Sequence, residues 1–114
     1  MKVYLSHSRK DLQVVIEITN AIRAEGIDVF NDNKLEAGEI WEEQIKSELE
    51  AADLIVVLWS EASASSTYVR DEASYARDHD KLFPVVLDKT KLPMGFQQFS
   101  TFSFSAPWGE TKQA

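Results

Sequence analysis

The sequence predicts an α/β fold, in which a doubly wound sheet of five mostly parallel strands carries helices on both faces. Segments of strand character alternate with segments whose apolar residues keep helical spacing, and this alternation is typical of parallel sheets. The run from Leu54 to Trp59 is apolar throughout, as expected of a strand buried on both faces. With 114 residues, the chain has the size of one ordinary domain. These observations favour the flavodoxin-like class of α/β fold.

Five segments have strand character, in chain order residues 2–6, 27–31, 53–60, 82–87 and 101–104. Pro84 removes one ladder donor from the fourth segment, so we expect it near the start of that strand. The carboxyl ends of parallel strands meet at one edge of a sheet. The loops that lead from these strands into the helices should therefore share one rim, where a ligand would bind.

Three helices are expected between the strands, over residues 9–25, from residue 41 past residue 49, and over residues 67–80. Ser8 followed by Asp11 gives an N-cap signal for the first helix, and Gly26 supplies its left-handed stop. In the second helix, apolar residues recur at helical spacing from Trp41 to Leu49, so Trp41 is interpreted as a core residue. Polar loops are expected at residues 32–39 and 61–66.

The composition excludes several kinds of partner. A net charge of −7 and a pI near 4.7 provide no basic surface for nucleic acid or anionic lipid. The chain has no cysteine, which removes disulfides and thiolate chemistry, and its two histidines alone predict no metal site. No apolar run approaches the ~20 residues that span a bilayer, and strand-like sequence begins without a signal peptide. We expect a cytoplasmic protein with no metal, nucleic-acid or membrane partner.

The expected site lies where the third helix starts, at the rim beside the buried strand. Tyr68, Glu72 and Tyr75 fall at i, i+4 and i+7, so they share one helical face. Open parallel sheets bind ligands outside the carboxyl ends of their strands. We therefore expect Glu72 on an exposed rim, aimed with Tyr68 at a crevice. The alternative is that Glu72 is an ordinary solvated helix acid.

Two cations, Arg9 and Lys10, follow the first strand at the predicted start of a helix. Free backbone amides and two positive charges at that place are able to hold a pyrophosphate. The alternative is that they are solvated surface charges paired with Asp11. The absence of a glycine-rich phosphate fingerprint favours that alternative when the residues are considered alone.

Four segments in order resemble the signature boxes of Toll/interleukin receptor (TIR) domains, namely VYLSHSRKD at residues 3–11, VFND at 29–32, KLEAG at 34–38 and YVRDE at 68–72. The resemblance covers residues 2–104 and is closer to the bacterial and axon-degeneration TIR proteins that cleave NAD than to receptor adaptors. It implies a TIR domain over residues 1–105, followed by a tail or the start of a linker at residues 106–114. It also implies self-association with other TIR domains, because many catalytic members act only when assembled.

The resemblance further implies an activity and the residues that carry it. The chain is expected to cleave the nicotinamide–ribose bond of NAD+, giving ADP-ribose or a cyclic isomer in bacterial anti-phage signalling, with NAD+ as substrate and no cofactor. Glu72 falls on the family's catalytic glutamate, and Gly38 on the loop that acts as a gate and in assembly. The family usually has tryptophan at the position of Tyr68. Substrate-binding positions of the family fall on Ser8, Arg9, Lys10, Asp32, Glu36, Ile40 and Tyr68.

Other interpretations remain. In a non-catalytic TIR interaction module, residues 32–40 would be a docking surface and Glu72 would be incidental. A nucleoside deoxyribosyltransferase-like enzyme has a related fold and a glutamate after a strand similar to residues 52–55, but it would have a Gly-Thr pair just before that acid, which this chain lacks. A phosphoacceptor receiver domain is excluded, because the first strand ends in Leu5, Ser6 and His7 and not in the acidic pair that binds magnesium.

Overall fold

The computed structural model describes residues 1–31 and 41–103 of the chain. Its strands are β1 (Lys2–Ser6), β2 (Asp28–Asn31), β3 (Leu54–Trp59), β4 (Leu82–Val86) and β5 (Phe102–Ser103). They form one sheet in the order β2-β1-β3-β4-β5, and every neighbouring pair is parallel. The predicted fold class is confirmed. The end predicted for the last strand and the boundary predicted at residue 105 lie outside the described residues.

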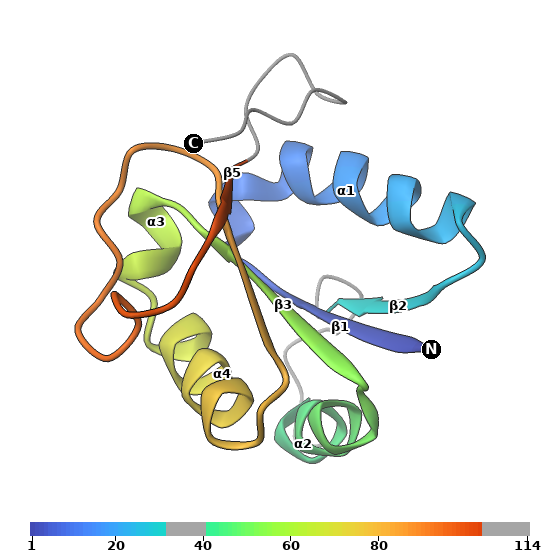
Figure 1. Cartoon of the computed structure of the whole chain (residues 1–114). Helices are drawn as coiled ribbons and strands as arrows, with labels where there is room; N and C mark the ends of the chain where they lie inside the picture. The colour runs from blue at the N-terminus through green and yellow to red at the C-terminus, as the bar shows by residue number, and fades with distance from the viewer. Residues whose placement is uncertain (32–40, 104–114) are drawn as a thin grey trace.

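Helices cover both faces of this sheet. Figure 1 shows α1 (Leu12–Ala24) on one face, with α2 (Trp41–Ala51) and α4 (Thr67–Asp78) on the other. The short helix α3 (Glu61–Ala64) follows β3 and leads into α4. Across residues 1–31 and 41–103, no helix combines the length and the apolar character needed to cross a bilayer.

Side chains of β1 contribute to two hydrophobic cores, one on each face of the sheet. Val3 and Leu5 pack with Val15 on the face covered by α1. Tyr4 belongs to the other core, under α2 and α4. Side chains two residues apart on a strand point the same way, so Ser6 lies on the same face as Tyr4. A tyrosine and a serine hydroxyl are thereby placed in the layer between the sheet and α4.

The first helix begins later than predicted. Residues Arg9–Asp11 form a 3-10 turn, and the α-helix starts at Leu12. Ser8 caps the turn as predicted, by accepting a hydrogen bond from Lys10 N at 3.1 Å. Asp11 makes no capping bond to its own helix; its carboxylate accepts a hydrogen bond from Ser60 Oγ at 2.5 Å. That bond joins the loop after β1 to the loop after β3.

The loop predicted at residues 61–66 contains α3, so that prediction is wrong. A capping box forms this helix, because Ser60 Oγ accepts from Ser63 N at 3.1 Å and Ser63 Oγ accepts from Ser60 N at 2.7 Å. Ser63 Oγ also donates to Leu58 O at 2.8 Å. Small polar residues at a strand end are typical of a loop, but two serines spaced three apart also satisfy the free amides of a helix start.

Pro84 was predicted near the start of its strand, but it lies in the middle of β4. Leu87 N donates to Trp59 O at 2.8 Å, and the alternation of strand backbone groups turns the Pro84 nitrogen away from β3. On its other side β4 pairs with β5 from Val85 onward. The proline therefore removes no donor from the ladder with β3, which explains its position.

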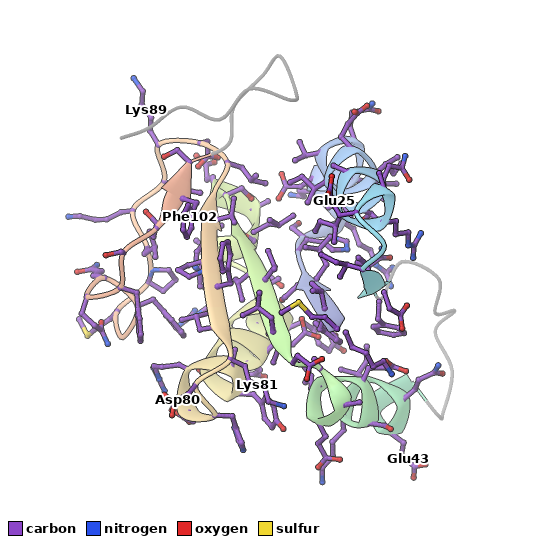
Figure 2. All side chains as sticks on the ribbon, turned by 45° about the vertical axis from the view of Figure 1, so that its right-hand side comes forward. Glu25, Glu43, Asp80, Lys81, Lys89 and Phe102 are labelled. Carbon is purple, nitrogen blue, oxygen red and sulfur yellow. The ribbon has the colours of Figure 1, made fainter. Side chains whose placement is uncertain are left out.

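Lys81 ties together the two helices on one face. Its Nζ donates to Leu49 O at 3.3 Å and to Glu50 O at 3.1 Å, close to the C-terminal end of α2. The same nitrogen lies 5.9 Å from the centre of the Tyr75 ring on α4. Figure 2 shows Lys81 just before β4, between these helices. A cation at the negative end of a helix is stabilising, so Lys81 stabilises the end of α2 while it contacts α4.

We expect Ser63→Ala to lower the free energy of unfolding by about 1–3 kcal/mol, because the buried groups Ser60 N and Leu58 O each lose a hydrogen-bond partner. Urea unfolding of the variant and the wild type measures the difference. The exposed Ser65→Ala change is the matched control, with an expected effect within about 0.5 kcal/mol. Equal stability of the two variants would show that the capping box does not hold α3.

Candidate functional site

Glu72 lies in the second turn of α4, on the side of the helix that faces the sheet. Ser66 caps this helix by accepting a hydrogen bond from Val69 N at 3.3 Å. Val69, Ala73 and Ala76 are buried in the core under the sheet. Glu72 itself is only 6% exposed. The expectation of an exposed rim residue, and the alternative of a solvated acid, are both wrong, because small side chains let α4 approach the sheet and bury the glutamate.

Two hydroxyls from β1 hold the Glu72 carboxylate. Tyr4 donates to Oε2 at 2.5 Å, and Ser6 donates to Oε1 at 2.6 Å. Both donors are 1% exposed. Hydrogen bonds to an ionised carboxylate are shorter and stronger than those between neutral groups. Each carboxylate oxygen thus has a buried donor from the neighbouring strand.

A cavity of about 380 Å³ opens beside Glu72, between α2 and α4. Its size is in the range of small-molecule sites. Tyr68 is 59% exposed, so most of its ring faces solvent beside the buried acid. The structure thereby brings Tyr68, Glu72 and Tyr75 to one cavity, as their shared helical face predicts. The lining residues are Ile45, Lys46, Leu49, Tyr68, Asp71, Glu72 and Tyr75.

The other predicted substrate-binding residues do not line the cavity beside Glu72, or lie outside the described residues. Arg9 and Lys10 are exposed and Ser8 is half-buried, in the turn that directly follows β1. These three residues lie two to four positions beyond Ser6 but do not line the cavity. The amides expected to hold a pyrophosphate belong to a 3-10 turn and not to a long helix. The remaining predicted positions, Asp32, Glu36, Gly38 and Ile40, lie outside the described residues.

A second carboxylate, Asp88, joins the loop after β4 to the start of α3. Its oxygens accept hydrogen bonds from Glu61 N at 3.1 Å and from Thr90 N at 2.9 Å. Partial burial raises the pKa of Asp88, but the bonds from the Glu61 amide and from the side chain and amide of Thr90 outweigh it and hold the pKa below its ordinary value of 3.8. Asp88 stays ionised at neutral pH and anchors the segment that precedes α4.

Tyr4 and Ser6 lie in the site but were not predicted there from the sequence. The predicted site residues come from helix faces and from loops after strands, and residues 2–6 were expected only to form a strand. A signal was present, because alternation places both hydroxyls on one face of a strand in the middle of the sheet. Buried hydroxyls need partners, and an inward-facing acid is one such partner.

The fold and the site together define a parallel α/β domain with a buried, hydroxyl-bound carboxylate beside a cavity. The TIR-domain family model matches residues 3–114, so the chain belongs to the TIR-domain family. No curated protein matches the sequence.

Solved structures agree with this assignment. The TIR domain of the Toll-related receptor TRR-2 from Hydra magnipapillata is 16% identical with a TM-score of 0.80, over 89% of this chain and 82% of that chain. The TIR domains of the activated Roq1 resistosome, which recognises the pathogen effector XopQ, are 28% identical with a TM-score of 0.66, over 78% and 58% of the two chains. A 2-deoxyribosyltransferase from Bacillus psychrosaccharolyticus shares the fold, with 17% identity and a TM-score of 0.67 over 91% and 85%.

We expect Asp88→Ala to lower the melting temperature at neutral pH and to have a much smaller effect in acid. The lowered pKa means that the ionised Asp88 stabilises the fold above the unfolded-state value near 3.8, and this contribution is lost as the pH falls through the folded-state pKa. Melting curves between about pH 7 and pH 2 measure it, with Asp28→Ala, an exposed aspartate, as control. A loss of melting temperature that is independent of pH would contradict this role of Asp88.

Proposed function

We propose that this TIR domain is an NAD+ nucleosidase that cleaves the bond between nicotinamide and ribose. The observation that carries the proposal is the Glu72 carboxylate, held by two hydroxyls at 2.5 and 2.6 Å beside a cavity of about 380 Å³. Glutamates on surface helices usually face water, whereas this one is turned inward. An acid held in a buried place next to a cavity is a candidate catalytic group.

The chemistry needs one carboxylate. Nicotinamide leaves a cationic pyridinium as a neutral molecule, so its departure needs no general acid, unlike that of an ordinary sugar leaving group, for which two carboxylates are used. As the bond lengthens, positive charge develops on the ribose. A fixed Glu72 carboxylate stabilises that charge and is able to bind the ribose hydroxyls. Water, or a nucleophile within the substrate, completes the reaction.

Other residues of the chain have the properties that the rest of NAD+ requires. Tyr68 offers an exposed ring on which a planar base can pack. Arg9 and Lys10 carry the charges that a pyrophosphate needs. In the same proposal, binding also uses Ser8, Asp32, Glu36 and Ile40, and Gly38 lets the loop open and close.

The proposal includes a setting for the reaction. The product is ADP-ribose or a cyclic isomer, the reaction follows self-association, and it serves bacterial anti-phage signalling in the cytoplasm. The similarity to TIR domains of an activated resistosome that recognises a pathogen effector supports an immune role for an assembled state. Catalysis by an assembly predicts weak activity in dilute solution.

We expect Glu72→Gln to reduce NAD+ turnover about a hundredfold or more, because it removes the charge that stabilises the transition state. The amide keeps the size of the side chain, but the burial of Glu72 makes a change in stability possible, so near-UV circular dichroism must first show that the variant is folded. Nicotinamide release from concentrated protein measures the rate. Glu17 is an exposed acid of α1, the helix on the other face of the sheet, so Glu17→Gln should retain the wild-type rate.

The rival function is a non-catalytic interaction module. If a folded Glu72→Gln protein turned over NAD+ at the wild-type rate, Glu72 would have no catalytic role. A wild-type protein that assembles but releases no nicotinamide would favour the interaction module instead.

A further inference from the structure

We infer that Tyr4 and Ser6 are positioning residues of the reaction, whose buried hydroxyls fix the Glu72 carboxylate in one orientation and keep it ionised. This inference rests on the proposed function, because it assigns a role in that reaction to two residues of β1. Both residues lie in the signature segment 3–11, but the resemblance assigns neither of them a role.

The geometry of one strand and one helix makes the pair possible. Tyr4 and Ser6 are two residues apart on β1, so they point to the same face and meet α4 there. Their side chains differ in length, and each reaches a different oxygen, Oε2 at 2.5 Å and Oε1 at 2.6 Å. A carboxylate bound at both oxygens cannot rotate about its last bond without losing a partner.

The ring of Tyr4 is itself fixed by packing. Its centroid lies 5.4 Å from that of Phe30 on β2, with the ring planes tilted by 36°, which is a favourable aromatic contact. Tyr4 also belongs to the core cluster that contains Ala73 of α4. The hydroxyl position is therefore set by the core, and the hydroxyl in turn sets the position of the acid.

The two hydroxyls also offset the cost of burying a charge. A carboxylate that is 6% exposed has lost most of its hydration, which favours the neutral form. Hydrogen bonds donated to the ionised form oppose that effect. Because hydroxyls are neutral, they hold the negative charge without cancelling it, and the charge remains available to a cation that develops on the ribose.

Other ionisable groups face the same place. They are Tyr68, Asp71 and Tyr75 from α4 and Lys46 from α2, all of which line the cavity with Glu72. Tyr4→Phe and Ser6→Ala replace none of these side chains. Each variant therefore differs from wild type by one hydroxyl group.

The kinetic test compares Tyr4→Phe, Ser6→Ala and the double variant with wild type, using NAD+ and concentrated protein over a range of pH. Each single change should lower kcat about tenfold or more, the loss expected for one hydrogen bond to a charged group, with KM changed much less. The acid limb of the kcat profile should move to higher pH. Ser65→Ala, which removes an exposed serine hydroxyl, should leave kcat, KM and the profile unchanged.

A second measurement does not depend on activity. Titration of the Glu72 carboxyl by carbon-13 NMR, without NAD+, should show protonation at higher pH in Tyr4→Phe than in wild type. Tyr4→Phe keeps the ring and its packing, so it should fold even if Ser6→Ala does not. If wild type releases no nicotinamide but this shift is observed, the proposed function is wrong. The conclusion that the Tyr4 hydroxyl stabilises the ionised Glu72 carboxylate would still be supported.

The inference is overturned by either of two results. One is that the two single variants, Tyr4→Phe and Ser6→Ala, are folded and have the wild-type kcat and the wild-type acid limb in the pH profile of kcat. The other is a Glu72 titration that is the same in Tyr4→Phe and wild type, since the hydroxyl would then not stabilise the ionised form.

Discussion

The contact between the Glu72 carboxylate and the hydroxyls of Tyr4 and Ser6 is the interaction on which the site depends. It joins β1 to α4, although Tyr4 and Glu72 are 68 residues apart in the chain and Ser6 and Glu72 are 66 residues apart. Three conditions must hold together for it to form: the alternation of β1 must turn both hydroxyls inward, α4 must carry small residues where it meets the sheet, and the helix phase must point residue 72 at β1. Each condition is a property of the fold, and the site is their common result.

The surrounding structure keeps this contact in place and leaves room beside it. Lys81 contacts both α2 and α4, through the carbonyls of Leu49 and Glu50 and through the Tyr75 ring, and the cavity lies between the same helices. Asp88 and the capping box of α3 hold the segment that leads into α4. The acid thus lies between a strand and a helix of the sheet, as its proposed role in stabilising a developing charge requires.

The sequence predicted the fold class, and it placed Tyr68, Glu72 and Tyr75 on one helical face. Helical spacing of apolar residues locates α1, α2 and α4, and segments of strand character locate β1 to β5. The run from Leu54 to Trp59 is apolar throughout because β3 is buried on both faces. The burial of Glu72 was not predicted, since a helix face in a sequence does not say how closely the helix approaches the sheet. The helix α3 and the late start of α1 depend on where the hydroxyls and carboxylates of Ser60, Ser63 and Asp11 find partners, and those partners are set by tertiary contacts.

Cleavage of NAD+ by this TIR domain, with Glu72 as the catalytic carboxylate, is the function proposed here. Incubating concentrated wild-type protein with NAD+ and resolving the products by mass tests it. We expect free nicotinamide in equal amount to ADP-ribose or its cyclic isomer, at a rate that rises more steeply than the protein concentration. NAD+ that stays intact at every concentration at which the protein assembles would contradict the claim.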